Sequence, residues 1–476
     1  MQTSTLSALR AIIGESRVLT SERDIALFRS DALTLFSCKP SAVLEPGSRK
    51  EVVACVQVLH AAGIPFTARG AGTGLSAGAL VPEGGVLISL LRLNEILEFN
   101  EDARFAVVEP GVINAELSQM LADSGLYYAP DPSSQLECTL GGNLAENAGG
   151  PHCCLHGMTA QHILFAEVVL ADGTVETWGS PTAAEDDFDL RGFLIGSEGS
   201  LAIALRIGVR LTPLPETAQT LLGAYPTMIE ACATTADIVA SGIQPVAMET
   251  MDQRTMQVVE NSIYAAGLPV EAGAVLIVEV EGTPQQVEQE AAEVEAILNR
   301  HEPLRVEHAR TVEHRAAIWA GRKGAGRAIR ALSPDSYVMD GVVPRSRLVE
   351  IMKFVAEIES ETGLEIANFF HAGDGNIHPH FCYDASDKEL TVKVERAGIR
   401  ILRKCLELGG SLSGEHGIGL EKEALLHEQF TPETLALMDR LRRVFNPKDL
   451  LNPGRGLPLG KGCAEAFHRH GGHSNA

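Results

Sequence analysis

The sequence lacks several features that whole classes of protein require. No run of 18 or more apolar residues is present, so we expect no membrane-spanning helix. Positive charge is scarce, because 39 lysines and arginines face 62 aspartates and glutamates, for a formal net charge of −23. Such a chain repels phosphate backbones, and no local basic patch offsets the repulsion. We therefore expect no nucleic-acid partner.

Cys-x-x-Cys pairs are also missing, although the chain contains nine cysteines. Without such pairs, neither an iron–sulfur cluster nor a structural zinc site is expected in this chain. The stretch Met1–Gly14 has the pattern of an amphipathic helix and lacks the basic and apolar regions of an export signal. We expect a cytoplasmic location, where unpaired cysteines stay reduced.

What is present is an average globular composition with glycine concentrated in the first half. The 476 residues are 45% hydrophobic and 21% charged, which suffices for two or three domains. Between residues 40 and 214 short apolar runs alternate with glycine-rich turns, and the pattern predicts a helix over Glu51–Ala62 and a hairpin turning at Asp172-Gly173. The glycine density falls at Thr212–Pro215, where we expect a domain boundary.

Beyond that boundary, strands alternate with longer helices. The expected elements are strands at Ala274–Val280, Leu304–His308 and Leu364–Phe370 and helices at Pro284–Arg300 and Arg345–Thr362. The predicted fold class is therefore α+β. Four segments are expected: an N-terminal helical segment (1–40), a glycine-rich α+β domain (41–214), a second α+β domain (215–415) and a helical C-terminal segment (416–476).

The first glycine-rich segment, Arg69–Gly78, contains a formal dinucleotide-binding pattern, Gly72-x-Gly74-x-x-Ala77. A Rossmann loop must lead into a helix, whereas here more glycines and Pro82 follow. Two alternatives remain for the segment taken alone. It is either a plain surface turn or a loop whose backbone N–H groups bind a pyrophosphate, with the arginine adding charge.

Three further segments, Pro130–Ser134, Gly141–Gly150 and Gly196–Gly199, follow in the same half of the chain. Together with the first segment they resemble the vanillyl-alcohol-oxidase type of FAD-linked oxidases. Within that family the resemblance is to the branch of bacterial glycolate oxidase flavoprotein subunits and FAD-linked D-lactate dehydrogenases. It extends from about Ser41 to Arg455.

The resemblance implies a PCMH-type FAD-binding domain, an α+β cap domain for the substrate, and a helical C-terminal segment that returns to the FAD domain. The residues it implies for FAD are Arg69, Gly70, Ala71, Gly72, Thr73, Gly74, Pro130, Asp131, Ser134, Gly141, Gly142, Asn143, Asn147, Gly149, Gly150, Glu198, Gly199 and Ile203. Relatives with covalent flavin usually have a histidine in the first glycine loop. Since Arg69–Gly78 contains none, we expect non-covalent FAD. The sequence departs from the family at Ala77, Ala202 and residues 152–156.

Histidines in the second half predict a metal site. His371 and His378 flank a Gly-Asp-Gly-Asn turn between apolar strands, and such a hairpin would bring them to opposing positions across its mouth. The alternative is a pair of satisfied core histidines. A second cluster, Ser413–Gly419, contributes Glu415 and a further histidine, and its alternative is a glycine-rich connection with solvated charges. Together the clusters form a His/His/Glu set that suits zinc, manganese or iron.

The resemblance assigns roles to these residues. It implies that His371, His378 and Glu415 bind the metal and that His416 is the catalytic base. It also implies that Arg322 binds the substrate carboxylate, for which the alternative is a pair of basic residues on a helix surface. The expected reaction is the oxidation of a small D-2-hydroxy acid, in which the metal lowers the pKa of the hydroxyl and hydride passes from C2 to the flavin.

Glycolate and D-lactate are the expected substrates. Met339-Asp340 stands where some relatives specific for 2-hydroxyglutarate have a lysine, so a dicarboxylate is disfavoured. The alternatives are a D-2-hydroxyglutarate-type dehydrogenase, a non-catalytic FAD-binding subunit of an electron-transfer complex, and an oxidase that reduces O₂. NAD is not expected as acceptor. The resemblance implies iron–sulfur and second flavoprotein subunits as partners, and such a partner would hold the chain peripherally at the inner face of the cell membrane.

Overall fold

The computed structural model describes residues 1–182, 188–456 and 468–469. The chain divides into two compact units. Unit 1 holds the described residues of Met1–Gly149, Met158–Leu214 and Glu415–His470, and unit 2 holds those of Gly150–Gly157 and Pro215–Gly414. Residues 457–467 and 470–476 of the predicted C-terminal segment lie outside the described residues.

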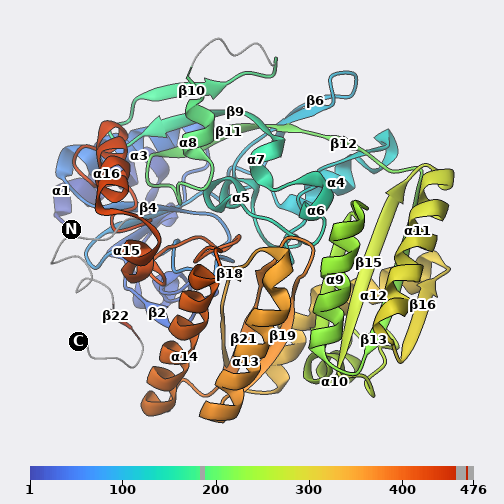
Figure 1. Ribbon diagram of the computed structural model, residues 1–476. Helices are drawn as coiled ribbons and strands as arrows, with labels where there is room; N and C mark the ends of the chain where they lie inside the picture. The colour runs from blue at the N-terminus through green and yellow to red at the C-terminus, as the bar shows by residue number, and fades with distance from the viewer. Residues whose placement is uncertain (183–187, 457–467, 470–476) are drawn as a thin grey trace. The chain divides into compact units, whose positions relative to one another are not determined.

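The first sheet of unit 1 has the order β1-β3-β5-β4, and its last three strands are parallel. Figure 1 labels its edge strand β4. The strands are β1 (Val18–Leu19), β3 (Ala42–Leu44), β5 (Val86–Ser89) and β4 (Phe66–Arg69). The helix α3 (Arg49–Ala62) connects β3 to β4, begins after the capping hydroxyl of Ser48 and ends at Gly63 in the left-handed conformation. This confirms the helix predicted over Glu51–Ala62. The N-terminal helix α1 (Thr3–Ile13) packs on α3.

The second sheet of unit 1 is antiparallel, with the order β10-β9-β11-β7-β6. Its strands are β10 (Val175–Gly179), β9 (Ile163–Leu170), β11 (Ala202–Arg210), β7 (Phe105–Val108) and β6 (Ile96–Asn100). The hairpin predicted to turn at Asp172-Gly173 is β9–β10. Val169 and Ile203 share one core with α3, and the alternate residues Val168 and Ala204 face a second core, so both faces of the sheet are buried.

Short elements complete unit 1, and the last part of the chain runs beside β4. The remaining helices are α2 (Glu22–Ile25), α4 (Asn114–Met120), α5 (Leu140–Glu146), α7 (Thr159–His162), α8 (Leu190–Leu194), α15 (Leu426–Gln429) and α16 (Pro432–Phe445). The remaining strands are the pairs β8 (Leu126–Tyr127) with β12 (Thr212–Pro213), and β2 (Phe36–Ser37) with β22 (His468–Arg469). Leu451 forms a bridge with Phe66, and the N–H of Asn452 donates to the carbonyl of Phe66 at 2.8 Å.

Unit 2 is built on a sheet of long and short strands in the order β16-β13-β15-β14-β19-β20-β18. The strands are β16 (Arg305–Ala309), β13 (Thr217–Tyr225), β15 (Ala274–Gly282), β14 (Ala247–Asp252), β19 (Glu365–His371), β20 (Asn376–Ile377) and β18 (Gly341–Val342). In addition, β21 (Pro379–Tyr383) pairs with β19 and with β17 (Asp335–Val338). The strands predicted over Ala274–Val280, Leu304–His308 and Leu364–Phe370 are confirmed as β15, β16 and β19.

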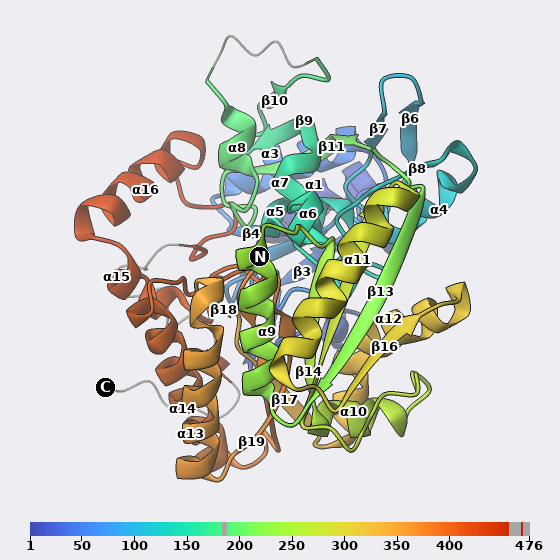
Figure 2. The same ribbon diagram turned by 45° about the vertical axis from the view of Figure 1, so that its right-hand side comes forward.

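Helices cover both faces of this sheet. Helices α9 (Met228–Ser241) and α11 (Pro284–Leu298) pack on β13 and β15 on one face (Figure 2). On the other face, α10 (Gln253–Glu260) and α12 (Val312–Ala328) form a core with apolar residues of β13, β14 and β15. Helix α13 (Leu348–Thr362) lies between α9 and α14 (Lys388–Glu407), and the short α6 (Cys153–His156) contacts β14. The predicted helices Pro284–Arg300 and Arg345–Thr362 are confirmed as α11 and α13. A 3₁₀ turn follows α11, and another precedes α13.

Candidate active site

The first glycine loop of unit 1 begins where β4 ends, at Arg69, and no helix follows it. This confirms that the formal dinucleotide pattern is not a Rossmann loop. Gly72 has a φ of 72°, a conformation that favours glycine. A Cβ on Gly70 would lie 2.2 Å from the hydroxyl oxygen of Thr139, so the loop packs closely against the residue that caps α5. The first and third predicted cofactor segments are thus neighbours.

Arg69 is buried and its guanidinium is used within unit 1. Nη1 donates to the carbonyl of Ser30 at 2.9 Å, and the guanidinium carbon lies 5.7 Å from the ring centroid of Phe28. Burial raises the pKa of the adjacent Asp31 to about 7, although the Leu33 N–H and the charge of Arg69 act in the opposite direction. The arginine therefore ties the glycine loop to the N-terminal segment.

The second predicted cofactor segment is held by α4. The side-chain amide of Asn114 donates to the carbonyl of Pro130 at 3.0 Å, and the Asn114 N–H donates to the carbonyl of Cys138 at 3.0 Å. Asp131 is 8% exposed within this loop. The segment is therefore a fixed, largely buried turn and not a solvated surface loop.

The third predicted segment is partly helical, which its glycine content did not suggest. Residues Leu140–Glu146 form α5, whose first turn is capped by the Thr139 hydroxyl accepting from the Gly142 N–H at 3.2 Å. The helix ends at Asn147, which has a φ of 53°. Gly141 allows close approach, because a Cβ there would lie 2.6 Å from Pro110. The helix forms because the cap and the burial of Leu140 and Leu144 offset the loss of helix stability that the two glycines cause.

Glu198, predicted to line the cofactor, holds a turn in unit 1. Its carboxylate accepts from the N–H of Ile418 at 2.7 Å and from that of Gly419 at 2.8 Å. Its backbone has a φ of 50°, and its carbonyl accepts from Asn452 Nδ2 at 2.7 Å. Glu198 therefore connects the fourth glycine segment to the residues after the Glu-His pair.

Buried polar atoms around these segments fit a large polar ligand such as FAD. The hydroxyl of Ser76 and Oε2 of Glu146 are buried and have no hydrogen-bond partner among the described residues. Burial, and then the Glu198 carboxylate, raise the pKa of Glu146 well above its ordinary value. A Cβ on Gly74 would meet nothing within 4 Å, so the loop borders open space. Unsatisfied buried groups beside a glycine loop are what a bound cofactor would complete.

In unit 2 the two predicted metal-binding histidines lie together, but not in the predicted register. His371 pairs with Asn376, and not with His378. The expectation of directly opposing histidines was wrong. The four-residue turn sets a register in which the residue opposite His371 is Asn376, two positions before His378. Asn376 and His378 are nevertheless two positions apart in the extended segment that runs from β20 to β21, and side chains two positions apart in extended backbone face the same side. The imidazole centroids of His371 and His378 are therefore 5.1 Å apart, with an interplanar angle of 86°.

Protein groups orient both imidazoles. Nδ1 of His371 lies 2.7 Å from Oε1 of Glu249, and Nδ1 of His378 lies 3.2 Å from the carbonyl of Met339. An acceptor at Nδ1 places the ring proton there, so Nε2 carries the lone pair. This is the usual arrangement around a metal-binding histidine.

Asp340 orders the turn that precedes the Glu-His pair. Its carboxylate accepts from Asn376 Nδ2 at 3.0 Å and from the hydroxyl of Ser413 at 2.5 Å, and its carbonyl accepts from the Gly414 N–H at 3.0 Å. A Cβ on Gly414 would lie 2.4 Å from the amide of Asn376, so glycine is required at this contact. The next residues of the chain are Glu415 and His416, and the chain therefore carries them to the place that Asp340 fixes.

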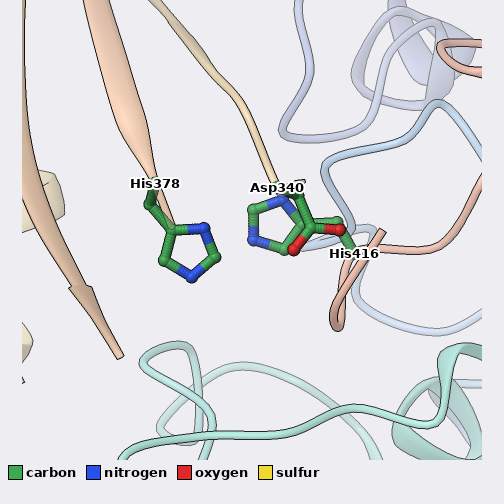
Figure 3. Close-up of side chains that lie close together, drawn as sticks. All are labelled: Asp340, His378 and His416. Atoms are coloured by element: carbon green, nitrogen blue, oxygen red, sulfur yellow. The ribbon is translucent and has the colours of Figure 1, made fainter. Parts of the chain in front are cut away.

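Two overlapping groups of side chains could hold an ion. Ligand atoms of His371, His378 and Glu415 all lie within 4.8 Å of one another, and the same is true of Asp340, His378 and His416. Figure 3 shows Asp340, His378 and His416 close together. Two imidazole nitrogens with one carboxylate oxygen are a donor set that fits zinc, manganese or iron.

Arg322 lies on α12 and is 2% exposed, so the alternative of a solvated basic pair is wrong for this residue. Its Nη2 is 2.5 Å from Oε2 of Glu249, and its guanidinium carbon is 5.3 Å from the ring centroid of Phe369. Its Nε is buried and has no hydrogen-bond partner among the described residues. A buried guanidinium with an unused N–H is suited to bind a carboxylate.

The structure thus brings the predicted FAD segments, apart from Gly150, together in unit 1 and His371, His378 and Arg322 together in unit 2. Glu249, which contacts both His371 and Arg322, was not predicted from the sequence. The sequence feature that could have revealed Glu249 is a single carboxylate inside the apolar run Val246–Met251. An unpaired charge is not tolerated in a central strand, so this carboxylate requires a buried partner. The role of Asp340 in ordering the turn was also missed.

No helix within the described ranges is long and apolar enough to cross a membrane.

Comparison with known families identifies both halves of the chain. Residues 40–179 match the family described as FAD binding domain, and residues 214–455 match the family described as FAD linked oxidases, C-terminal domain. FAD is therefore the cofactor of the chain's first half. The second match alone covers about half of the chain.

Curated relatives match over nearly the full length. The chain is 40% identical to glycolate oxidase subunit GlcD of Escherichia coli (strain K12) over 474 residues, which are 99% of this chain and 95% of that protein. It is 36% identical to glycolate oxidase subunit GlcD of Bacillus subtilis (strain 168), over 90% of this chain and 91% of that protein. It is 30% identical to a D-lactate dehydrogenase of Anaerostipes hadrus, over 93% of this chain and 95% of that protein.

Solved structures share the fold at low identity. A p-cresol methylhydroxylase with bound substrate gives a TM-score of 0.81 at 15% identity, covering 96% of this chain and 97% of that one. The 4-ethylphenol oxidase from Gulosibacter chungangensis gives 0.79 at 18% identity, with the same coverage. The α+β fold class and the PCMH-type FAD-binding domain are thereby confirmed. The chain belongs to the FAD-linked oxidases of the vanillyl-alcohol-oxidase type, and it is a flavoprotein oxidoreductase.

Proposed function

We propose that this chain oxidises a small D-2-hydroxy acid, glycolate to glyoxylate or D-lactate to pyruvate, with FAD and a divalent metal. The observation that carries the proposal is the pair of histidines whose Nδ1 atoms are both bound by protein acceptors, beside a buried arginine. Relatives named glycolate oxidase subunit and D-lactate dehydrogenase, 40% and 30% identical over more than nine-tenths of this chain, support it.

The proposed metal ligands are Nε2 of His371, Nε2 of His378 and the carboxylate of Glu415. When bound, the metal would lower the pKa of the hydroxyl group of a 2-hydroxy acid, as it does for bound water. The donor set leaves positions open for the substrate, because two imidazoles and one carboxylate do not fill the shell of zinc, manganese or iron. These three residues would also fix where the substrate hydroxyl lies.

The remaining residues supply a base and a cation. Arg322 binds the substrate carboxylate through the N–H groups that Glu249 does not use. His416 takes the proton of the 2-hydroxyl group, because adjacent Glu415 and His416 cannot easily both bind one small ion, and the carboxylate is the better anionic ligand. When bound, FAD supplies the acceptor for the hydride that leaves C2, and the product is the 2-oxo acid.

For FAD we propose the four glycine-rich segments as the binding surface. The proposed contacts are residues 69–74, 130–134, 141–150 and 198–203. The buried Ser76 hydroxyl and the Glu146 carboxyl support this surface, since each has an atom without a hydrogen-bond partner in the described part of the chain. We propose that the flavin is non-covalent, since Arg69–Gly78 contains no histidine.

We also propose that electrons leave the flavin for a protein partner and not for NAD. The sequence has no Cys-x-x-Cys pair that would hold a cluster of its own. A glycolate-oxidase-type complex with an iron–sulfur subunit and a second flavoprotein subunit is the proposed assembly, and its support is the likeness to subunits of that name. For the domains we propose limits near residues 41, 215 and 415.

Anaerobic reduction of the bound flavin by matched D- and L-2-hydroxy acids tests the function. Glycolate or D-lactate should bleach the flavin absorbance, while L-lactate and D-2-hydroxyglutarate should leave it largely oxidised. Bleaching by D-2-hydroxyglutarate in preference to glycolate and D-lactate would favour the dicarboxylate alternative. A flavin that stays oxidised with every acid, in protein loaded with zinc, manganese or iron, would overturn the proposal.

A further inference from the structure

Glu249 is a fully buried carboxylate in the middle of the unit 2 sheet. It lies on β14, is 0% exposed, and is the cross-strand partner of His371 on β19. Its neighbours on the same face, Ala247 and Met251, belong to the core beneath α12. A charge in such a place is tolerated only when it is paired and hydrogen-bonded.

The two oxygens of Glu249 have different partners. Oε1 lies 2.7 Å from Nδ1 of His371, and Oε2 lies 2.5 Å from Nη2 of Arg322. Both partners are buried, at 5% and 2% exposure. One carboxylate therefore connects the proposed metal ligand to the proposed substrate arginine.

We propose that Glu249 is a positioning residue that sets both the metal affinity of His371 and the orientation of Arg322. The inference rests on the proposed function. As an acceptor at Nδ1, the carboxylate holds His371 in the tautomer whose Nε2 can bind a metal and makes that nitrogen a stronger donor. As the counterion of Arg322, it holds the guanidinium in the core while the Nε–H has no hydrogen-bond partner among the described residues, so that this N–H is available to a carboxylate.

The neighbouring strand supplies a matched control. Glu279 on β15 is also 0% exposed and is also paired with an arginine of α12, since Arg315 Nε lies 2.8 Å from its Oε2. Trp319 donates to the same oxygen at 2.5 Å. Burial alone would raise the pKa of Glu279, but hydrogen bonds from Arg315 and His152 hold it below its ordinary value. Glu279 thus resembles Glu249 in burial and pairing but contacts no proposed metal ligand.

The test measures metal affinity in the FAD-loaded protein, with Zn²⁺ or Mn²⁺ alone in competition with a chelator. Glu249→Gln keeps the shape of the side chain but loses the charge, and we expect it to weaken metal binding by about 10-fold to 100-fold. Glu279→Gln should bind the metal within about twofold of the unsubstituted protein. The KM for the hydroxy acid should rise in Glu249→Gln, because Arg322 loses its counterion, and should change little in Glu279→Gln.

A further variant keeps the test decisive if Glu249→Gln does not fold. Removing one partner of a buried pair leaves an uncompensated charge, whereas removing both leaves none. Glu249→Gln combined with Arg322→Met should therefore fold, and its metal affinity should be as weak as in the single variant. Folding is checked by bound FAD and by thermal unfolding.

The outcomes separate this inference from the proposed function. If the unsubstituted protein binds neither metal, the proposed function fails. If the unsubstituted protein binds metal and every folded Glu249 variant binds the metal with the same affinity, Glu249 is not a positioning residue, and the proposed function survives. Equal weakening by Glu249→Gln and Glu279→Gln would also overturn the inference, since the effect would then be general loss of the sheet.

Discussion

Replacing the buried Asp31 by asparagine should stabilise unit 1, and the gain should grow with pH. Asp31 is 6% exposed, and its Oδ1 accepts from the Leu33 N–H at 3.0 Å. Burial raises its pKa from an ordinary 3.8 to about 7, against the opposing effects of the Leu33 N–H and of the charges on Arg69 and Arg455. Asparagine has the shape of the protonated form, so it avoids the cost of a buried charge.

The sign follows from proton binding. Between pH 3.8 and about 7 the folded state keeps a proton that the unfolded state releases, so stability falls as pH rises through this window. Above pH 7 the cost is fully present. A pKa of about 7 against 3.8 corresponds to roughly 4 kcal/mol, at about 1.36 kcal/mol per pKa unit. Asp31→Asn should therefore gain on the order of 2 to 4 kcal/mol at pH 8 and almost nothing near pH 4.

Urea unfolding can measure this difference in unit 1 alone. The chain has two tryptophans, and with Trp319→Phe in both proteins the fluorescence of the buried Trp178 reports on unit 1. Saturating FAD in both samples cancels its contribution. Asp102→Asn, at an exposed position of the same unit, serves as the control. A difference between Asp31→Asn and its parent that is the same at pH 4.5 and pH 8 would refute the reasoning.

Three further predictions concern the proposed site. His416→Ala should keep FAD and metal while slowing flavin reduction by about 100-fold to 10,000-fold in stopped-flow measurements; loss of metal or an unchanged rate would contradict its role as base. His371→Ala should lose the metal by elemental analysis and abolish reduction while keeping FAD, because the proposed FAD segments, apart from Gly150, lie in unit 1; retained metal would refute the ligand assignment. Asp340→Asn should lower the free energy of unfolding by about 1.5 to 3 kcal/mol, because the charged acceptor of the Asn376 and Ser413 hydrogen bonds is lost. An unchanged urea midpoint would show that these bonds do not order the turn.

The sequence predicted the fold best where a local pattern and burial agree. The helix α3 has its capping Ser48, its apolar stripe and its terminal Gly63 in the sequence, so its limits were nearly correct. The segment Leu140–Glu146 was missed as a helix because two glycines hide the pattern, and only the tertiary burial of Leu140 and Leu144 decides its conformation.

The site was predictable as a set of residue types but not as a geometry. The spacing of His371 and His378 indicated a turn between strands, yet the length of that turn fixed a register in which His371 faces Asn376. Because side chains alternate between the two faces of extended backbone, His378 lies on the same face as Asn376, two positions earlier. A one-residue change in the turn would have sent it to the opposite face, so spacing alone could not distinguish a metal site from two separate core histidines.

Glu249 shows why long-range pairing limits what a sequence can tell. It is 73 residues from Arg322 and 122 from His371, and nothing local links the three. What the sequence does contain is a carboxylate in an apolar strand, and elementary electrostatics requires a buried partner for it. Two such carboxylates, Glu249 and Glu279, occur on adjacent strands, and each is paired with an arginine of α12. Their other partners differ, because Glu249 contacts a proposed metal ligand on β19 whereas Glu279 accepts from Trp319 of the same helix α12, and that difference gives Glu249 a predicted effect on metal affinity that Glu279 lacks.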